Sequence, residues 1–166
     1  MQISGPEIEK KFNREISSVV KRSQSAKNHF QFKEEITFND FFSNKLLMIL
    51  IIRAGVPYSL FDLIQHYTPF TENDWSAFLE ISAKSLQRYK QSDKQFKSIQ
   101  SEKIIEMAEV TNIGLDVFGD MDKFKLWLNT SNFALGGLKP IELLKDSYGK
   151  EMVVGELTRI NYGVLA

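Results

Sequence analysis

VFGDMDKFKLWLNTSNFALGGLKPIELLKDSYGKEMVVGELTRINYG, residues 117–163, is the stretch that decides the fold of this chain. Three short helical patterns follow one another here, with glycines at most of the corners between them. None of the familiar catalytic or metal-ligand motifs falls within the stretch. So many changes of direction with so few reactive groups are typical of a surface that binds a partner.

The first pattern predicts a helix capped by Asp120 or Asp122, because aspartate accepts hydrogen bonds from the free N–H groups at a helix start. Phe124, Trp127 and Leu128 then recur at the spacing of one helix face. A tryptophan three residues after a phenylalanine on so short a helix packs inward far more often than it contacts a partner. We therefore expect Trp127 in the core.

The second pattern lies between glycines. The pair Gly136-Gly137 predicts a tight turn, since glycine adopts positive φ without steric cost. Pro140 suits the first turn of the helix that follows, where its missing N–H is no loss. Ile141 and the pair Leu143-Leu144 give that helix a buried side, and Gly149 is predicted to end it.

The third pattern predicts a helix with Val153, Leu157 and Ile160 on one stripe, ending at Gly163. The tail that follows, residues 163–166, is apolar. A partner could bury such a tail, or it could close the domain's own core.

Upstream, residues 72–91 predict a helix-turn-helix. The first helix is Glu72 to Glu80, and Ile81-Ser82 forms the turn, where Ser82 can cap the second helix, Ala83 to Gln91. In DNA-binding proteins of this kind the second helix lies in the major groove. Its polar residues are of types that pair with base edges or phosphates. The candidate DNA-binding residues are Lys84, Ser85, Gln87, Arg88 and Lys90.

Residues 6–22 predict a further helix. Residues 30–38 alternate loosely between apolar and polar side chains, as in a short strand or an extended arm, and the pattern does not decide between the two. The rest of the chain outside 30–38 is predicted to be helix or connecting loop, so the fold class is all-α. Its remaining helices are expected over 39–54, 58–67 and 101–110.

The composition narrows the class of protein. There are 21 basic and 21 acidic side chains, so the chain is neutral, which argues against a general polyanion binder but not against a local basic face. Cysteine is absent, which excludes disulfides and thiolate zinc sites. There is no signal peptide pattern and no apolar run long enough to span a bilayer. We expect a cytoplasmic protein with no membrane partner.

No enzyme motif is present. His29 and His66 are the only histidines, they are far apart in the sequence, and no nucleophile elbow or HExxH pattern accompanies them. The Leu135–Leu138 turn lacks the lysine and hydroxyl of a phosphate loop. We therefore expect no catalytic activity, no cofactor and no metal ion.

The residues of the opening stretch resemble the toxin-binding domain of the Xre/MbcA/ParS-like antitoxins. Upstream, Arg53-x-Gly55-x-Pro57 and residues 71–110 are similar to the Xre-like helix-turn-helix half of that family. The resemblance covers roughly residues 45–166 and does not reach residues 1–40. The motifs that match the family's toxin-binding domain agree with it in order and spacing. They are VFGD (117–120), Trp127-Leu128, the LGG turn (135–137), Pro140 with Leu143-Leu144, Gly149, and the closing Leu157-x-Arg159-Ile160-x-x-Gly163.

The resemblance implies a type II antitoxin that represses its own promoter and covers the active site of a RES-domain toxin, which acts on NAD. Arginine and tyrosine are enriched at the energetic centres of interfaces. By this resemblance the toxin-binding residues are Arg159, Asn161, Tyr162, Gly163, Val164 and Leu165. The other interpretation is that Tyr162 and Leu165 merely close the domain's own core.

We also expect a homodimer within a larger toxin–antitoxin complex, because a single helix-turn-helix contacts few base pairs. The predicted organisation is an N-terminal extension (a helix plus an arm) over residues 1–40, a helix-turn-helix-containing helical domain over 41–113, and a toxin-binding domain over 114–166. One alternative is a transcriptional regulator without a toxin partner, whose C-terminal domain only dimerises. Another is a helical adaptor that binds neither DNA nor toxin.

Overall fold

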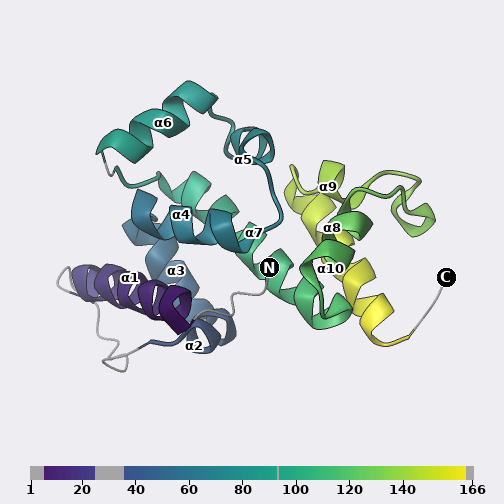
Figure 1. Cartoon of the computed structure of the whole chain (residues 1–166), viewed down its shortest axis with the longest axis horizontal. Coiled ribbons are helices and arrows are strands. Elements are labelled where there is room, and N and C mark those ends of the chain that lie inside the picture. Colours follow the sequence, from purple (N-terminus) through teal and green to yellow (C-terminus); the bar gives the residue numbers. More distant parts are fainter. Residues whose placement is uncertain (1–5, 25–35, 93, 164–166) are drawn as a thin grey trace. The chain divides into compact units, whose positions relative to one another are not determined.

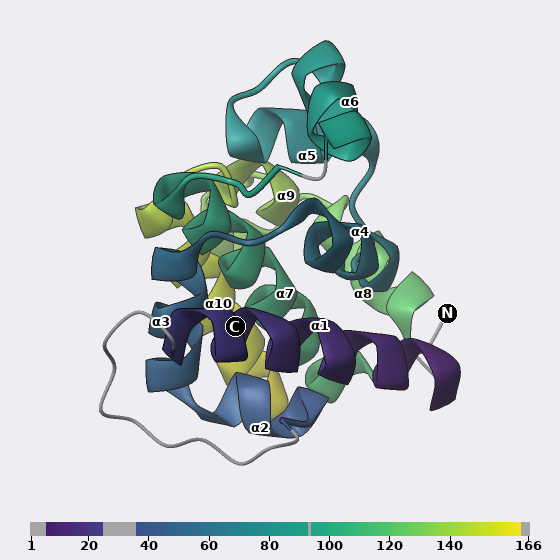
Figure 2. The ribbon, with the colours of Figure 1, turned by 90° about the vertical axis from the view of Figure 1, so that its left-hand side faces the viewer.

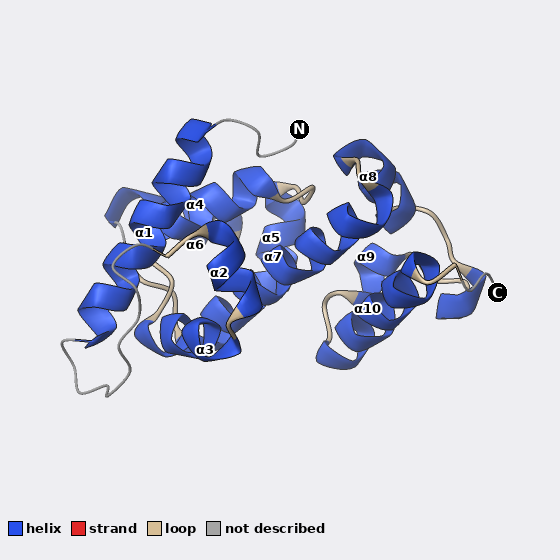
Figure 3. Ribbon diagram, turned by 90° about the horizontal axis from the view of Figure 1, so that it is seen from below, coloured by secondary structure: helices blue, strands red, loops and turns tan. Residues whose placement is uncertain are grey.

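The computed structural model describes residues 6–24, 36–92 and 94–163, which fall into two compact units. One unit extends to Glu106 and the other begins at Met107, within the long helix α7 (Ser98–Phe118). Figure 1 labels the helices along the chain, and Figure 3 shows helices joined by loops throughout the described ranges. The all-α fold predicted from the sequence is confirmed for these residues.

The first unit is built on helix α1 (Pro6–Gln24) and the three helices that it packs against: α2 (Phe38–Ser43), α3 (Lys45–Ala54) and α4 (Tyr58–Tyr67). Figure 2 shows α1 lying across this group. The helix predicted over 6–22 is confirmed, and its apolar stripe is buried: Phe12, Ile16, Val19 and Val20. Of the strand or arm predicted over 30–38, residues 30–35 lie outside the described residues.

The single helix predicted over 39–54 is wrong, because the chain breaks there into α2 and α3. Asn44 separates them: its side-chain oxygen accepts a hydrogen bond from the Leu47 N–H at 3.2 Å and so begins α3. Thr37 begins α2 in the same way, accepting from the Asp40 N–H at 3.2 Å. A short polar side chain that bonds the nearby backbone competes with helix continuation, and Asn44 does so here.

Helices α5 (Glu72–Leu79) and α6 (Ala83–Ser92) complete the first unit around an aromatic cluster. The buried Trp75 ring makes edge contacts with Phe61, Phe70 and Phe78 at centroid distances of 5.1 to 6.0 Å. After α6 the chain returns to the turn between α3 and α4, where the Phe96 N–H donates to the Val56 carbonyl at 2.8 Å. Helix α6 packs on α4, and Trp75 of α5 packs on Phe61 of α4, so both helices of the predicted helix-turn-helix contact α4.

Helix α7 is longer than the predicted segment 101–110, and its middle is buried on more than one side. Ile104, Ile105, Met107 and Ala108 are all at most 3% exposed. The charged residues Glu102, Lys103, Glu106 and Glu109 occupy the remaining side of the helix. Helix α3 is buried on one side only, since Leu47 and Ile51 are buried while Leu46 and Ile49 are exposed.

The second unit contains the end of α7, then α8 (Met121–Leu128), a 3₁₀ turn (Phe133–Leu135), α9 (Pro140–Leu143) and α10 (Ser147–Asn161). Asp120 caps α8, as predicted, by accepting a hydrogen bond from the Lys123 N–H at 2.9 Å. Phe124 is buried, and Trp127 is half-buried against Phe124 and Phe118. Trp127 therefore packs on the core, as expected, without being enclosed by it.

The glycines of this unit serve different purposes. Gly136 and Gly137 have φ of 70° and 78°, which confirms the predicted tight turn. Gly149 does not end a helix, contrary to the prediction: α9 ends at Leu143, and Gly149 lies in the first turn of α10. A Cβ atom on Gly149 would overlap the carbonyl group of Leu143, so this glycine permits the close packing of α9 on α10.

No helix in the described ranges is both long enough and apolar enough to cross a bilayer.

Candidate functional site

The turn of the helix-turn-helix is fixed by side-chain caps on both of its helices. At the start of α5, the Asp74 N–H donates to Thr71 Oγ1 at 3.2 Å and the Thr71 N–H donates to Asp74 Oδ2 at 2.8 Å. Helix α5 ends at Glu80, which has a left-handed backbone with φ of 52°. Ser82 Oγ then accepts from the Ser85 N–H at 3.1 Å, which is the predicted cap of α6.

The inner side of α6 is held by two contacts. Leu86 is buried. The ring of Tyr89 is stacked on Phe96 with a centroid distance of 4.3 Å and an interplanar angle of 1°. These contacts fix the rotation of α6 about its own axis and so determine which of its residues face outward.

The outer side of α6 carries most of the predicted DNA-binding residues. Lys84, Gln87 and Arg88 are exposed and, at i, i+3 and i+4, share one face. Lys90 is exposed on one flank of that face. Ser85 is half-buried on the other flank, and its backbone N–H is already bonded to Ser82.

The charges on this face are available. No ion pair involves Lys84 or Arg88 within the part of the chain that the structure describes. The carboxylate of Asp74, on the neighbouring α5, is occupied by the Thr71 cap. On α4, burial raises the pKa of the Tyr58 hydroxyl, and the nearby carboxylates of Asp62 and Glu72 raise it further, so Tyr58 stays neutral.

The second unit exposes apolar side chains that its own core does not use. Isolated exposed apolar residues are ordinary, whereas grouped ones mark interaction surfaces. The large ones between 40% and 95% exposed in this unit are Leu126, Phe133, Leu138, Tyr148, Met152 and Tyr162.

Helix α10 has two apolar sides. One packs inward through Val153 and Leu157, which are buried, and Ile160, which is half-buried. The other faces away from the core, and we call it the α10 stripe. At about 100° per residue, positions i, i+4, i+7, i+11 and i+14 fall on one side of a helix. These positions hold Tyr148, Met152, Gly155, Arg159 and Tyr162, the last directly after the helix end.

Gly155 is unexplained by the unit's own packing. It is exposed in the helix interior, and no atom lies within 4 Å of where its Cβ would be. Glycine inside a helix costs roughly 0.5–1 kcal/mol relative to alanine. A glycine in the middle of this exposed stripe leaves room for another molecule to approach the backbone of α10 closely.

The structure places four of the six predicted toxin-binding residues at the end of α10. Tyr162 is 78% exposed, so it does not close the domain's own core. Arg159 Nη1 lies 3.2 Å from Oε2 of Glu156, one turn earlier, whose side chain is only 11% exposed. Asn161 and Gly163 are exposed too. Val164 and Leu165 lie outside the described residues.

Tyr148, Met152 and Gly155 were not predicted as contact residues. Their sequence signal is a second helical period in 147–162 that is out of phase with Val153, Leu157 and Ile160. The periodicity alone could not assign the outward side, because both stripes contain large apolar residues and only the packing on α9 and on the 3₁₀ turn selects the inner one.

Comparison with known proteins assigns both units. The model of the antitoxin Xre-like helix-turn-helix domain matches residues 48–109, and that of the antitoxin Xre/MbcA/ParS C-terminal toxin-binding domain matches residues 114–163. An antitoxin Xre of Photorhabdus laumondii is 26% identical over 117 residues, which cover 70% of this chain and 79% of the relative. An antitoxin Xre of Yersinia enterocolitica is also 26% identical, over 75% of this chain and 84% of the relative.

Proposed function

Since this chain belongs to the Xre family of type II antitoxins, we propose that it neutralises a NAD-consuming RES-domain toxin by covering the toxin's active site. We further propose that a homodimer of the chain represses its own promoter through α6. The observation that carries the first proposal is the α10 stripe, which lies within the segment matched by the toxin-binding domain model.

The stripe supplies the residue types that anchor interfaces. Tyr148 and Tyr162 each combine a large apolar ring with a polar tip, and such residues dominate interface energetics. Gly155 lies between them and allows a partner's backbone or helix to approach α10 closely. The toxin would therefore be held along α10, with the C-terminal residues nearest to its catalytic pocket.

Arg159 is suited to entering that pocket. A guanidinium carries five N–H donors, so Arg159 can bind an acidic or polar group of the toxin while it stays paired with Glu156, whose side chain is only 11% exposed. A guanidinium gains most from a partner that accepts two hydrogen bonds in a dry site. Inhibition needs no chemistry in this proposal, because NAD and the C-terminal residues compete for one space.

The proposed DNA contact rests on the outer face of α6. Arg88 and Gln87 can pair with base edges in the major groove, while Lys84 and Lys90 suit phosphates. Dimerisation would double the number of base pairs contacted and match a two-fold symmetric operator.

Co-expression tests the toxin proposal. The toxin alone should stop growth and deplete cellular NAD, and the full chain should prevent both effects. With purified proteins, NAD consumption should fall in step with the antitoxin added and end at a fixed ratio. A stop codon after Gly163 removes Val164 to Ala166 while keeping α10 whole, so it isolates the part played by the tail.

Two results would overturn parts of the proposal separately. If a tight complex forms but still consumes NAD at the full rate, the proposed occlusion of the active site is wrong, while the proposed toxin binding stands. If no complex forms with any RES-domain protein encoded beside this gene, the proposed RES-domain partner is wrong. The C-terminal unit would then serve regulation of DNA binding alone.

A further inference from the structure

Helix α1 precedes both matched segments, since the first of them begins at residue 48. It nevertheless packs on the core of the first unit through α3 and α4. Its outward side therefore has no role assigned by the two domains that identify the family.

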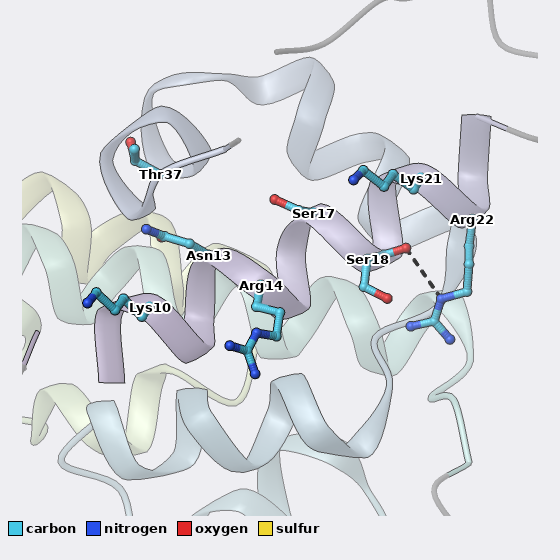
Figure 4. Close-up of a pocket in the computed structure, with 8 residues that line it drawn as sticks. All are labelled: Lys10, Asn13, Arg14, Ser17, Ser18, Lys21, Arg22 and Thr37. Carbon is cyan, nitrogen blue, oxygen red and sulfur yellow. Dashed lines mark hydrogen bonds between the residues drawn. The ribbon is translucent and has the colours of Figure 1, made fainter. Parts of the chain in front are cut away.

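That outward side forms a polar groove of about 740 Å³. Figure 4 shows its side chains along α1, with Thr37 lying across from Asn13 and Ser17. Half of the lining residues are basic, and no acidic residue lines the groove within the described ranges. The basic residues are Lys10, Arg14, Lys21 and Arg22, and the others are Asn13, Ser17, Ser18 and Thr37, whose hydroxyl is already bonded to Asp40.

No acidic side chain of α1 lines this groove. Glu7 Oε1 lies 3.8 Å from Lys11 Nζ, and neither residue lines the groove. Glu15 accepts a hydrogen bond from Ser59 Oγ at 2.7 Å, on the side that meets α4. Lys10 and Arg14 take part in no ion pair within the described part of the chain.

The cations are spread along the helix. From Lys10 to Arg22 they cover about 18 Å of α1, at 1.5 Å per residue. One strand of duplex DNA places about five phosphates along that length. A line of cations thus matches a line of phosphates better than it matches one compact anion.

We propose that this basic groove on α1 binds the phosphate backbone of double-stranded DNA beside the segment read by α6. This inference rests on the proposed DNA binding of the helix-turn-helix. Helix α4 packs against both α1 and α6, and Figures 1 and 2 show it between them. The axes of packed helices lie about 8–10 Å apart, so the packing of α1 on α4 and of α4 on α6 places the axis of α1 on the order of 20 Å from that of α6. A major groove is about 12 Å wide, so α1 would meet backbone outside the groove that α6 enters.

Other ligands fit the groove less well. A nucleotide pocket needs an apolar or aromatic wall for the base, and no aromatic residue lines this groove among the residues described. A helix that lies on a membrane needs an exposed apolar face, whereas the apolar face of α1 is buried.

The test compares two full-length triple variants with equal loss of charge. One is Lys10→Gln, Arg14→Gln and Arg22→Gln on the α1 face. The control is Lys123→Gln, Lys125→Gln and Lys145→Gln, three exposed lysines of the second unit. Binding to a promoter duplex and to a scrambled duplex is measured by fluorescence anisotropy over a range of salt concentrations, after circular dichroism has shown unaltered folding.

The α1 variant should bind both duplexes more weakly by the same factor. The slope of log affinity against log salt should fall by about 0.9 per lost phosphate contact, or roughly three in all. The control should match the unmodified chain. An α1 variant with unchanged slope and affinity overturns the inference, as does absence of all duplex binding at low salt. A variant that keeps DNA binding but loses the toxin or a second copy would show that the groove binds protein instead.

Arg88→Ala, measured beside these variants, separates the two proposals. If it removes the preference for the promoter while the α1 variant changes nothing, the helix-turn-helix stands and the α1 site fails. If only the α1 variant loses affinity, the basic groove binds DNA and α6 does not read it.

Discussion

Gly149 lies so close to the carbonyl group of Leu143 that no side-chain atom fits between them. The contact joins the first turn of α10 to the last residue of α9. Six residues along α10, Gly155 lies in open space. Two glycines of one helix are therefore present for different reasons, one inside the unit and one outside it, and they should respond differently to substitution.

Gly149→Ala should destabilise the protein, because the added methyl group must push a backbone carbonyl aside. Overpacking of this kind costs about 1–3 kcal/mol. Thermal and urea unfolding followed by circular dichroism should show a lower midpoint. Gly155→Ala is the matched control and should raise stability by roughly 0.5–1 kcal/mol, because alanine favours helix over glycine. Equal effects at the two positions would contradict the packing described here.

Gly155→Gln should separate stability from toxin binding. Glutamine favours helix over glycine, so folding is retained or improved, yet its side chain would stand in the middle of the α10 stripe. We expect at least tenfold weaker binding in a titration with the purified toxin. Thr130→Gln, at an exposed position outside α10, should bind like the unmodified chain. Unchanged affinity of the Gly155 variant would remove the stripe from the interface.

Ser101→Ala should destabilise the first unit. The Ser101 hydroxyl is buried, accepts from the Val56 N–H at 2.9 Å and donates to the Phe96 carbonyl at 3.2 Å. Its removal leaves a buried N–H unbonded, which costs about 1–3 kcal/mol. Thr111→Val is the control, since the buried Thr111 hydroxyl only adds a bond to the Met107 carbonyl within its own helix. Urea unfolding that shows a larger loss for the control would contradict this account.

Arg88→Ala should weaken binding to the chain's own promoter by about 1–3 kcal/mol and relax the preference at one base position, as expected for a lost pair with a base edge. Competition between the promoter duplex and single-base variants measures both effects. Lys125→Ala removes an exposed positive charge of the second unit and is the control. A uniform loss over all duplexes would instead make Arg88 a phosphate contact.

Local signals in the sequence were sufficient for much of the fold. The helix Tyr58–Tyr67 has the predicted bounds, and Asp120 and Ser82 cap the helices that were expected. Each of these features depends on residues within about one helical turn, so a short window of sequence contains its cause.

The features that sequence reasoning missed depend on contacts between elements. Asn44 stands in an apolar stretch that reads as one helix, and only its bond to the Leu47 N–H shows the break. Gly149 resembles a helix stop because the approach of Leu143 cannot be read from spacing. The DNA-binding and toxin-binding residues themselves remain predictions.

Helix α7 begins in the unit that contains the helix-turn-helix and ends in the unit matched by the toxin-binding domain model, and this constrains how such genes can be recombined. A crossover that exchanges toxin specificity between relatives finds no loop between residues 98 and 118. A junction at Gly119 preserves the helix, but the half that supplies α7 must then carry Gly114, since a larger residue there would overlap the Phe124 ring of α8. Hybrid antitoxins should therefore be most stable when the half that supplies α7 has glycine at this position.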